Sequence, residues 1–542
     1  MTRQDIKDAL MQVVREYQMQ EMLPQFESSQ INVERSADPK FGDYATNIAL
    51  KIAPQAKKPP QTVAEILTKR LKEKIRFAEI KIAPPGFINF YLLKEYLREQ
   101  VEEVLEEGAN FGSLDIGWSQ KVQVEFISAN PTGPLTLGNG RGGFFGDTLA
   151  NVLKKAGFEV SRAYFINDAG YQVEILGHSI LKDEQAQYRG KYIDDLRKQI
   201  ESKLDLPPKE LGRLAAVIIW NSLIRPTIEE RMKINFDEWI SEQEIRESDL
   251  PEKILEILKR KNLTYEKDGA LWFKSTEFGD DKDRVLITSE KDGREQEATY
   301  VLPDAACHYK KFVINKFDRV VDIWGADHHG YVARLQAFGK ALGVWDENNL
   351  KIIIIQLVRL FKGGEEVKMS KRAGTYITLD ELLENVPLDV ARFFFLMYST
   401  DTHMDFNLDL ARERSEKNPV YYVQYAHARI SSILKKAAAE GAGFEESNKT
   451  FNLLKETSEM GLIKQLIRFP EIVEDTAKDY QMQRLPQYSL DLVRAFHKFY
   501  EQCRVISEDK EKTRARLSLV EATRVVLKST LALMGISAPE KM

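Results

Sequence analysis

Apolar and polar residues follow one another along the chain in patterns that predict three structural regions. Residues 1 to about 22 place an apolar stripe on one face of a helix, formed by Ile6, Ala9, Leu10, Val13, Val14 and Tyr17. Residues 77–92, FAEIKIAPPGFINFYL, are typical of two strands joined by Pro-Pro-Gly, and helical spacing follows as far as Leu105. We therefore expect a self-contained α/β module over residues 1–115.

Strand-like and helical segments alternate between residues 116 and 395. The run from Val122 to Ser128 is typical of a buried strand, and helical spacing resumes at Asp147 after a turn rich in glycine and proline. The β-branched run from Ile352 to Ile355 predicts a second buried strand. This alternation predicts an α/β doubly wound (Rossmann-like) domain. We interpret the helical and charged stretch over about 180–300 as a helical insertion with a small core of its own.

From Pro387 onward the apolar spacing is helical nearly throughout. This pattern predicts a C-terminal α-helical bundle, which we place at residues 396–542. The expected architecture is thus an N-terminal α/β module, a doubly wound domain and a helical bundle.

Composition narrows the class of protein. The 542 residues are too many for one ordinary core, and 43% hydrophobic with 30% charged residues is typical of a globular protein. No apolar run approaches the roughly 20 residues that a membrane span needs, so we expect no membrane association. Cys307 and Cys503 form neither a disulfide framework nor a metal-binding pattern, which favours a reducing cytoplasm and no structural metal.

The net charge of −5 argues against a protein coated with basic residues for nucleic-acid binding. It leaves room for a local basic groove beside acidic helices.

Two segments have the composition of phosphate-binding elements. The strand from Val122, its glycine-rich turn and the following helix form an arrangement that places a phosphate at a helix N-terminus. The spacing matches neither G-x-x-x-x-G-K-[ST] nor G-x-G-x-x-G, and plain α/β architecture explains such a turn equally well. The basic run from Lys368 to Arg372 lies between Gly363–Gly364 and Gly374, on a loop able to close over a ligand. A solvated charged face is the alternative.

Together these segments resemble the class I aminoacyl-tRNA synthetases. Lys-Met-Ser-Lys-Arg resembles the family's mobile lysine loop, and Thr136-Leu137-Gly138-Asn139 occupies the place of its His-x-Gly-His sequence. The phrases VEFISANPTGPL, YFINDAGYQ, ALWFKSTEFGDDKDRVLI, VDIWGADHHGYVARL, KMSKRAGTYITLDELL and ALMGISAPEKM are similar to the arginyl-tRNA synthetase branch of the class. They run almost from end to end of the chain.

The resemblance implies an arginine–tRNA ligase. The arginine carboxylate attacks the α-phosphate of ATP to form arginyl-adenylate and pyrophosphate, and the 3′-terminal ribose of tRNA(Arg) then takes the arginyl group. This chemistry requires positioning and neutralisation of phosphate charge rather than an enzyme nucleophile. Mg²⁺ is expected with the nucleotide. The implied catalytic residues are Lys371, Lys368, Thr136 and Asn139, and the implied ATP-binding residues are Pro131, Gly133, Gly138, His328, Met369 and Ser370.

The histidines usual in this family are replaced here by Thr136 and Asn139. A hydroxyl and an amide can each donate a hydrogen bond to a phosphate oxygen, but neither becomes cationic. We therefore expect this position to lack a titration near neutral pH. An inactive paralogue is the alternative interpretation, against which the intact lysine loop argues.

Arginine carries a planar guanidinium, which a carboxylate beside an aromatic ring recognises best. Tyr300 and Asp304 have the i, i+4 spacing that places both on one face of a helical turn, although Asp304 after Pro303 is also typical of a helix N-cap. By resemblance, the further arginine-binding residues are Glu125, Ser128, Asn130 and Asp327, and Asn167, Asp168 and Gln172 lie at the pocket edge. A buried Glu125 requires a cationic partner, either the substrate or an internal salt bridge.

The resemblance also implies two surfaces for tRNA. The N-terminal module touches the tRNA elbow in this family, with Tyr44, Asn47, Phe87 and Asn89 as the matching positions, and the insertion is placed to brace the acceptor end. The helical bundle binds the anticodon, with Tyr421, Tyr425, Arg429 and Arg504 as candidates. All of these residues are also compatible with roles in the core.

We expect a cytoplasmic, monomeric enzyme. Two alternatives stay open from the sequence: a class I synthetase for another amino acid, and a noncatalytic RNA-binding paralogue that uses the two terminal regions as clamps.

Overall fold

The computed structural model describes residues 2–290, 296–367, 377–443 and 448–542. Its N-terminal part is built on an antiparallel sheet in the order β1-β2-β4-β3. The strands are β1 (Glu34–Arg35), β2 (Tyr44–Thr46), β3 (Ala78–Ala83) and β4 (Phe87–Leu92), and the helices are α1 (Thr2–Met19), α2 (Ile48–Ala56) and α3 (Pro60–Lys74). The strand pair at Pro-Pro-Gly and the amphipathic first helix agree with the sequence pattern, with Ile6, Leu10 and Val13 fully buried.

The central domain is organised around a parallel sheet of five strands in the order β12-β11-β5-β6-β7. The strands are β5 (Lys121–Glu125), β6 (Glu159–Ile166), β7 (Glu238–Ser241), β11 (Arg319–Gly325) and β12 (Leu350–Ile355). The chain moves to one side of β5 through β6 and β7, and to the other side through β11 and β12. The sheet is therefore doubly wound, as predicted, and its strand order reverses between β5 and β11.

Helix α5 (Leu137–Lys155) begins ten residues before the predicted resumption at Asp147. The glycines that suggested a turn instead form the first half of the helix. A Cβ atom added at Gly146 would lie 2.3 Å from Cγ of Phe126, and one added at Gly143 would lie 2.5 Å from Cε of Met232. Gly143 and Gly146 are thus required for close packing of this helix against Met232 and Phe126 rather than for a reversal of the chain.

The stretch 180–300 differs from the helical insertion that we expected. It contains α7 (Lys191–Gln199), α8 (Pro208–Ile219), α9 (Glu242–Glu247) and α10 (Leu250–Arg260), but also strand β7 of the main sheet. A small antiparallel sheet of β8 (Thr264–Lys267), β9 (Ala270–Phe273) and β10 (Arg284–Ile287) follows. The sequence pattern does not reveal these strands because each is only four residues long, which is too short for a clear alternation of apolar and polar residues.

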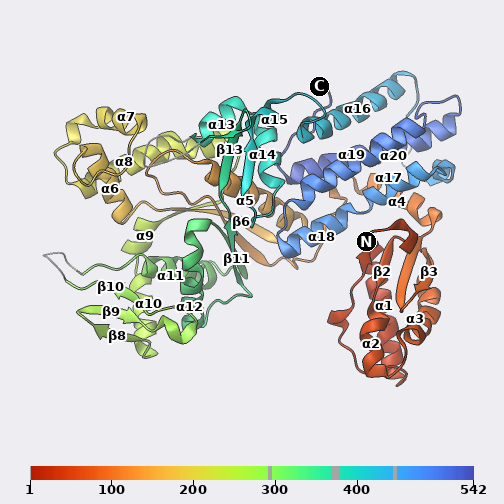
Figure 1. Ribbon diagram of the computed structural model, residues 1–542, viewed down its shortest axis with the longest axis horizontal. Helices are drawn as coiled ribbons and strands as arrows, with labels where there is room; N and C mark the ends of the chain where they lie inside the picture. Colours follow the sequence, from red (N-terminus) through yellow and green to blue (C-terminus); the bar gives the residue numbers. More distant parts are fainter. Residues whose placement is uncertain (1, 291–295, 368–376, 444–447) are drawn as a thin grey trace.

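Helix α6 (Tyr171–Leu181) packs against α8, and α11 (Val301–Tyr309) and α12 (Val332–Leu342) pack beside α10 (Figure 1). Beyond β12, a mixed sheet in the order β14-β13-β15 is formed by β13 (Val358–Lys362), β14 (Glu365–Glu366) and β15 (Met404–Asn407). Helices α13 (Leu379–Asn385), α14 (Leu388–Leu396) and α15 (Leu408–Arg412) complete this region.

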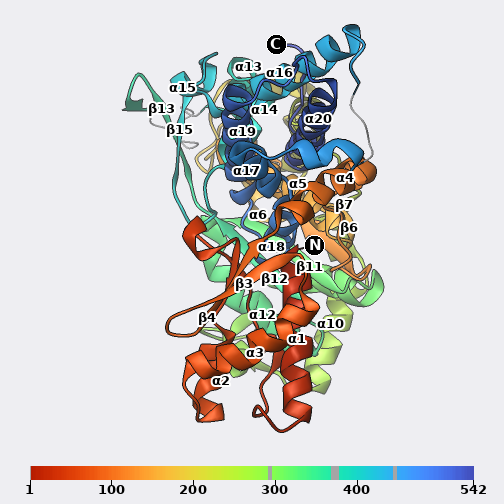
Figure 2. The ribbon, with the colours of Figure 1, turned by 90° about the vertical axis from the view of Figure 1, so that its right-hand side faces the viewer.

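The C-terminal region is helical, as predicted. It consists of α16 (Pro419–Ala439), α17 (Thr457–Leu466), α18 (Phe469–Asp479), α19 (Arg484–Gln502) and α20 (Lys510–Leu533). Helix α4 (Lys94–Glu107), which follows the N-terminal sheet, packs against α17 and α20. Figures 1 and 2 both show the N-terminal sheet and its helices below these C-terminal helices.

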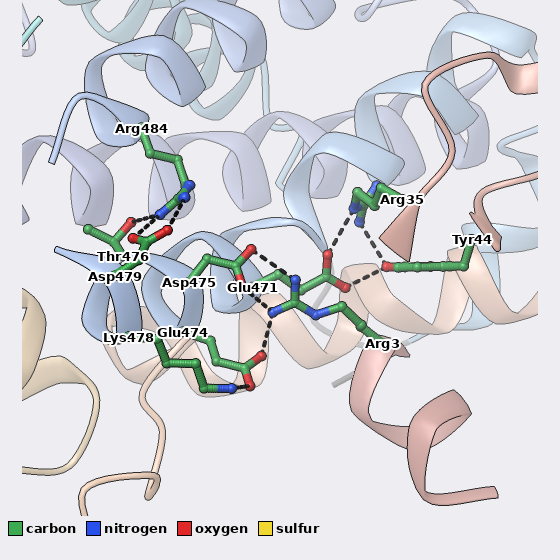
Figure 3. Close-up of polar contacts among 10 residues, drawn as sticks. All are labelled: Arg3, Arg35, Tyr44, Glu471, Glu474, Asp475, Thr476, Lys478, Asp479 and Arg484. Carbon is green, nitrogen blue, oxygen red and sulfur yellow. Dashed lines mark hydrogen bonds and ion pairs between the residues drawn. The ribbon is translucent and has the colours of Figure 1, made fainter. Parts of the chain in front are cut away.

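A group of ion pairs joins α1 and strand β1 of the N-terminal part to α18 (Figure 3). Arg3 forms ion pairs with Glu474 at 2.6 Å and Asp475 at 2.7 Å, and Arg35 lies 2.9 Å from Glu471. The two parts are therefore held together by charged contacts over this boundary as well as by the packing of α4.

Candidate functional site

A cavity of about 1100 Å³ opens at the carboxyl ends of the parallel strands. Glu125 at the end of β5, Phe165 near the end of β6 and Trp324 near the end of β11 line it. In doubly wound sheets, ligands bind outside the carboxyl ends of the strands, at the point where the strand order reverses. Here this point lies at the ends of the neighbouring strands β5 and β11. Five of the predicted arginine-binding residues line this cavity: Glu125, Ser128, Asn130, Tyr300 and Asp304.

The loop after β5 is held in an unusual backbone conformation. Ile127 has a φ of 68° and Ser128 a φ of 38°, values that non-glycine residues, and β-branched ones above all, rarely adopt. The Ser128 hydroxyl donates to Oε1 of Glu125 at 3.1 Å and accepts the Phe165 N–H at 3.1 Å. Backbone strain of this kind concentrates at binding sites. Asn130 in turn donates to the side chain of Gln172, one of the predicted pocket-edge residues.

Glu125 is paired inside the protein, which favours the second of its two sequence interpretations. Its Oε2 atom lies 2.8 Å from Nζ of Lys311, and the same ammonium lies 3.0 Å from Oδ1 of Asp322. Oδ2 of Asp322 is 2.7 Å from Nε2 of His308, whose Nδ1 is 2.8 Å from the backbone carbonyl of Asp304. This chain of contacts connects β5 and β11 to α11 beneath the floor of the cavity.

Helix α11 begins after Tyr300, whose backbone forms the N-cap, so the alternative role of Asp304 as an N-cap is wrong. Asp304 instead lies within the first turn of the helix and is half-buried. Among the described residues its carboxylate has no hydrogen bond or ion pair. Burial and the nearby carboxylates of Glu242 and Glu125 raise the pKa of Asp304 to about 7. An unpaired carboxylate of this kind is suited to a cationic ligand.

Tyr300 lies at the rim of the same cavity, where its ring centroid is 5.4 Å from that of Tyr331. Nη1 of Arg334 donates to the Tyr300 hydroxyl at 3.0 Å, and its guanidinium carbon lies 4.3 Å from the centroid of the Tyr331 ring. Partial burial acts to raise the pKa of Tyr300, but hydrogen bonds with Tyr331 and Arg334 and the charge of Arg334 lower it overall.

Glu242 and Arg246 of α9 form another pair in the cavity wall that the sequence interpretation missed. The Oε1 atom of Glu242 is 2.7 Å from Nη2 of Arg246, and Nη1 of Arg246 donates to the carbonyl of Ala298 at 3.2 Å. Burial raises the pKa of Glu242 although Arg246 opposes this effect. The charge of this carboxylate is thus already matched.

His328 lines the cavity, but Asp327 does not belong to its lining. The Asp327 side chain is 81% exposed and lies 3.6 Å from Nε2 of His328. His328 also lies edge-on to the Tyr331 ring, with centroids 5.7 Å apart. In this conformation Asp327 is therefore removed from the other predicted arginine-binding residues.

Thr136 and Asn139 form a capping box at the start of α5. The Thr136 hydroxyl accepts the Asn139 N–H at 3.3 Å, and Oδ1 of Asn139 accepts the Thr136 N–H at 2.9 Å. Gly138, between them, is exposed. Pro131 and Gly133 are buried, and a Cβ at Gly133 would lie 3.1 Å from the Tyr192 ring. The helix N-terminus is thus ordered by its own side chains, with its dipole available to an anion.

The predicted lysine loop, including Lys368, Met369, Ser370 and Lys371, lies outside the described residues.

Three of the four predicted anticodon-binding residues lie along α16 of the helical bundle. Tyr421, Tyr425 and Arg429 follow one another at intervals of four along α16, and the first two rings are stacked with centroids 6.3 Å apart. The Arg429 guanidinium lies 4.5 Å from the centroid of the Tyr500 ring on α19. Arg504, just beyond α19, is exposed. Along α16, the tyrosines and Arg429 thus form an aromatic and cationic stripe of the kind that binds unstacked bases.

The N-terminal candidates divide into exposed and buried residues. Phe87 is 38% exposed and Asn47 is half-buried. Tyr44 has no exposed surface and Asn89 is only 3% exposed, so the expectation that they contact tRNA directly is wrong for this conformation. The Tyr44 side chain faces α18 (Figure 3), where it is enclosed between the sheet and the C-terminal helices.

Sequence reasoning missed Lys311, His308, Asp322 and the pairs Glu242–Arg246 and Tyr331–Arg334. One pattern could have indicated part of this set: Asp304, His308 and Lys311 stand at positions i, i+4 and i+7, which share one face of a helix. The pairs Glu242–Arg246 and Tyr331–Arg334 have i, i+4 and i, i+3 spacing, but this spacing alone does not show that they lie at the cavity. Asp322 comes from another segment and leaves no local signal.

Within the described ranges, no group of three or more His, Cys, Asp and Glu side chains is arranged to hold a metal ion. None of the helices in the described part of the chain is long and apolar enough to cross a membrane.

Comparison with known proteins places this site in a family. Residues 2–92 match the profile described as the arginyl tRNA synthetase N terminal domain. Residues 100–211 and 215–393 match the class I (R) tRNA synthetase catalytic domain, and residues 423–542 match the DALR anticodon binding domain.

Similar proteins cover nearly the whole chain. The arginine–tRNA ligase of Shouchella clausii is 43% identical over 96% of both chains. That of Listeria welshimeri is 43% identical over 99% of this chain and 98% of its own. The crystal structure of Thermus thermophilus arginyl-tRNA synthetase is 23% identical, has a TM-score of 0.79 and is covered completely in both directions, which shows that the fold is shared.

Proposed function

Because this chain belongs to the arginyl-tRNA synthetase family, whose members are ATP-using arginine–tRNA ligases, we propose that the cavity at the ends of β5 and β11 binds L-arginine for activation. The activated amino acid is arginyl-adenylate, and its arginyl group passes to the 3′ end of tRNA(Arg).

The unpaired carboxylate of Asp304 is the observation that carries the choice of site. A guanidinium placed beside it gains a charge-assisted hydrogen bond in a partly desolvated setting. Tyr300 offers an aromatic face at the rim, and Ser128 and Asn130 offer polar groups in the lining of the same cavity. Uncharged amino acids would leave Asp304 without a partner, which is a strong basis for rejection.

The ATP phosphates are proposed to lie at the N-terminus of α5. The capping box leaves the Nδ2 atom of Asn139 without a partner among the described residues, so it is free to donate to a phosphate oxygen. His328 and Gly138 are proposed as further contacts to the nucleotide. Lys368 and Lys371 would supply positive charge from the loop that the sequence identifies.

Mg²⁺ fits this arrangement as a companion of the nucleotide. It commonly keeps several waters and is held by phosphate oxygens with few protein ligands. The described residues form no cluster of acidic side chains that would hold a metal ion by itself, which is compatible with a metal ion bound mainly by ATP.

For tRNA(Arg), the face of α16 with Tyr421, Tyr425 and Arg429 is proposed to bind the anticodon together with Arg504. Asn47 and Phe87 are proposed to contact the tRNA elbow from the N-terminal sheet. We place the enzyme in the cytoplasm as a monomer, as the cysteine usage and the separate tRNA surfaces on one chain favour.

Charging of a tRNA(Arg) transcript with radiolabelled arginine tests the proposal, with an anticodon-swapped transcript as control. We expect arginine to be transferred to the first transcript and not to the second. Pyrophosphate exchange in the presence of tRNA, repeated with other amino acids, checks the substrate. Binding of tRNA without adenylate formation would identify a noncatalytic paralogue and refute the proposal.

A further inference from the structure

The ammonium group of Lys311 lies buried between two carboxylates. Its side chain is 1% exposed, and Nζ contacts Glu125 at 2.8 Å and Asp322 at 3.0 Å. Lys311 belongs to a π-helical turn, Lys310–Ile314, that directly follows α11. Wide turns of this type often occur at functional sites. One ammonium matches only one of the two negative charges, so the group needs a second cation to be neutral.

His308 is placed to provide that second cation. Its Nε2 atom is 2.7 Å from Oδ2 of Asp322, and its Nδ1 atom is 2.8 Å from the carbonyl oxygen of Asp304. A carbonyl oxygen and an ionised carboxylate oxygen both only accept hydrogen bonds. Both contacts can be hydrogen bonds only if each ring nitrogen donates, which requires the imidazolium form of the ring. Two cations and two carboxylates then form a closed, neutral group.

Asp304 lies next to this group without being part of its charge balance. The His308 ring bonds to the backbone carbonyl of Asp304 and not to its carboxylate. The neighbouring acid Glu242 is matched by Arg246 at 2.7 Å. The carboxylate of Asp304 thus stays unmatched within the described residues, while the adjoining acids of β5, β11 and α9 are each neutralised.

We propose that Lys311 and His308 are positioning residues for amino-acid selection, which neutralise Glu125 and Asp322 so that the substrate guanidinium is drawn to Asp304. The inference rests on the proposed function of the cavity. Without Lys311, Glu125 would be a second free carboxylate at the same cavity. The substrate cation would then have two anionic positions to choose between, and the reacting carboxylate would often be misplaced.

The protonation of His308 can be measured on the unaltered protein. Uniform ¹⁵N labelling of the seven histidines, with His308→Gln to assign the signal, gives the number of protons on the ring. We expect both nitrogens of His308 to carry a proton near neutral pH in the substrate-free enzyme. A neutral ring with a single proton would overturn the proposal, because the group would then carry a net negative charge.

A charge-balanced double variant tests the effect on selection. Lys311→Met combined with Asp322→Asn removes one charge of each sign and leaves Glu125 without its ion-pair partner. We expect the KM for arginine to rise by about tenfold or more, and the discrimination between arginine and lysine to fall, while the KM for ATP stays unchanged. A folded double variant with the wild-type KM for arginine would overturn the proposal.

Lys310→Met is the matched control. Lys310 is the adjacent lysine, partly exposed, with an ion pair to Glu238 at 3.4 Å, and it does not line the cavity. We expect its KM values to match those of the wild type. Circular dichroism establishes whether each variant is folded. If the double variant does not fold, the protonation of His308 in the unaltered protein tests the proposal. Failure of the wild-type protein to activate arginine would instead refute the proposed function, since the histidine measurement does not depend on activity.

Discussion

The hydroxyl group of Tyr44 on β2 donates a hydrogen bond to Oε1 of Glu471 on α18 at 2.6 Å, across the boundary between the N-terminal sheet and the C-terminal helices. The same hydroxyl accepts a hydrogen bond from Nη2 of Arg35 at 2.9 Å, and Arg35 also contacts Oε2 of Glu471. Burial raises the pKa of Tyr44 well above its ordinary value, so the phenol is neutral and able to donate. Three side chains thus form a closed hydrogen-bonded ring between two regions of the chain.

Replacement of Tyr44 by Phe should weaken the docking of the N-terminal sheet. Glu471 and Arg35 would each lose a partner in a buried setting, which costs about 1–3 kcal/mol. Urea unfolding followed by circular dichroism should show a lower midpoint for Tyr44→Phe. Tyr91→Phe is the control, because the Tyr91 hydroxyl donates to the Lys40 carbonyl at an exposed position and its loss should cost little. Equal midpoints for the two variants would contradict a role of the Tyr44 hydroxyl in docking.

The glycines of α5 allow a similarly matched pair of variants. Gly146→Ala would place a Cβ atom 2.3 Å from Cγ of Phe126, so strand loop and helix must separate at a cost of about 1–3 kcal/mol. Gly142→Ala meets nothing within 4 Å and should stabilise the helix by up to about 1 kcal/mol. The midpoint temperature of thermal unfolding should therefore fall for Gly146→Ala and rise for Gly142→Ala. A loss of stability in both would show that the helix tolerates no added methyl group at either position.

These glycines also illustrate what local sequence can and cannot predict. Apolar periodicity predicted the first helix, the strand pair at Pro-Pro-Gly, the strand after Val122 and the C-terminal helices, because each of those patterns depends on one element and one buried face. The glycine-rich stretch was predicted as a turn, since its composition suits a turn and its packing partner Phe126 cannot be recognised from spacing.

The cavity also contains contacts that the local sequence predicts and contacts that it does not. Tyr300 and Asp304 were predicted to share a helical face and both line the cavity. The partner of Glu125 could not be predicted, because Lys311 is 186 positions away along the chain. The sequence leaves both a tRNA-facing and a core position open for Tyr44, and only the contact with Glu471, 427 positions away, shows that it is enclosed. Contacts over such distances are set by the packing of whole domains and leave no trace in a local pattern.

The pKa of Asp304, raised to about 7, predicts how stability depends on pH. In the folded state the carboxyl binds its proton more tightly than at its ordinary pKa of 3.8. The free energy of unfolding therefore falls as pH rises from about 4 through 7, by at most about 4 kcal/mol. Asp304→Asn should be more stable than the wild type above pH 7, and this difference should vanish toward pH 4. Urea unfolding over this pH range measures the difference.

Asp346→Asn provides a control with the opposite sign. The backbone N–H of Asn348 donates to the Asp346 carboxylate at 2.8 Å and lowers the pKa of Asp346. This carboxylate adds stability above its ordinary pKa, and the contribution is lost as pH falls through the lowered value. Asp346→Asn should therefore be less stable than the wild type at neutral pH. A stability difference for Asp304→Asn that does not change with pH would contradict the raised pKa.

Binding of arginine should depend on pH for the same reason. Only the ionised form of Asp304 attracts a guanidinium, so the affinity for arginine should fall as pH drops below about 7. Calorimetric titration with arginine at several pH values measures this change. In Asp304→Asn, affinity for arginine should be low and nearly constant with pH, so the difference from the wild type should be largest above pH 7, while the affinity for ATP should stay close to that of the wild type. Equal losses for arginine and ATP would indicate a structural role for Asp304.

Lys371, which lies outside the described residues, is the predicted source of positive charge on the ATP phosphates. Negative charge shifts onto the leaving pyrophosphate as the bond to the α-phosphate breaks, and a preorganised cation lowers the barrier of this step. Its removal in Lys371→Ala should reduce the rate of arginine activation by about two to three orders of magnitude, the scale observed for one lost electrostatic contact. Pyrophosphate exchange in the presence of tRNA measures this rate.

Lys340→Ala, which removes a surface lysine paired with Glu347, is the control and should leave the rate of arginine activation unchanged. If Lys371→Ala kept the wild-type rate, the charge that stabilises the leaving pyrophosphate would have to come from another group, and the resemblance of Lys368 to Arg372 to a catalytic loop would lose its functional meaning.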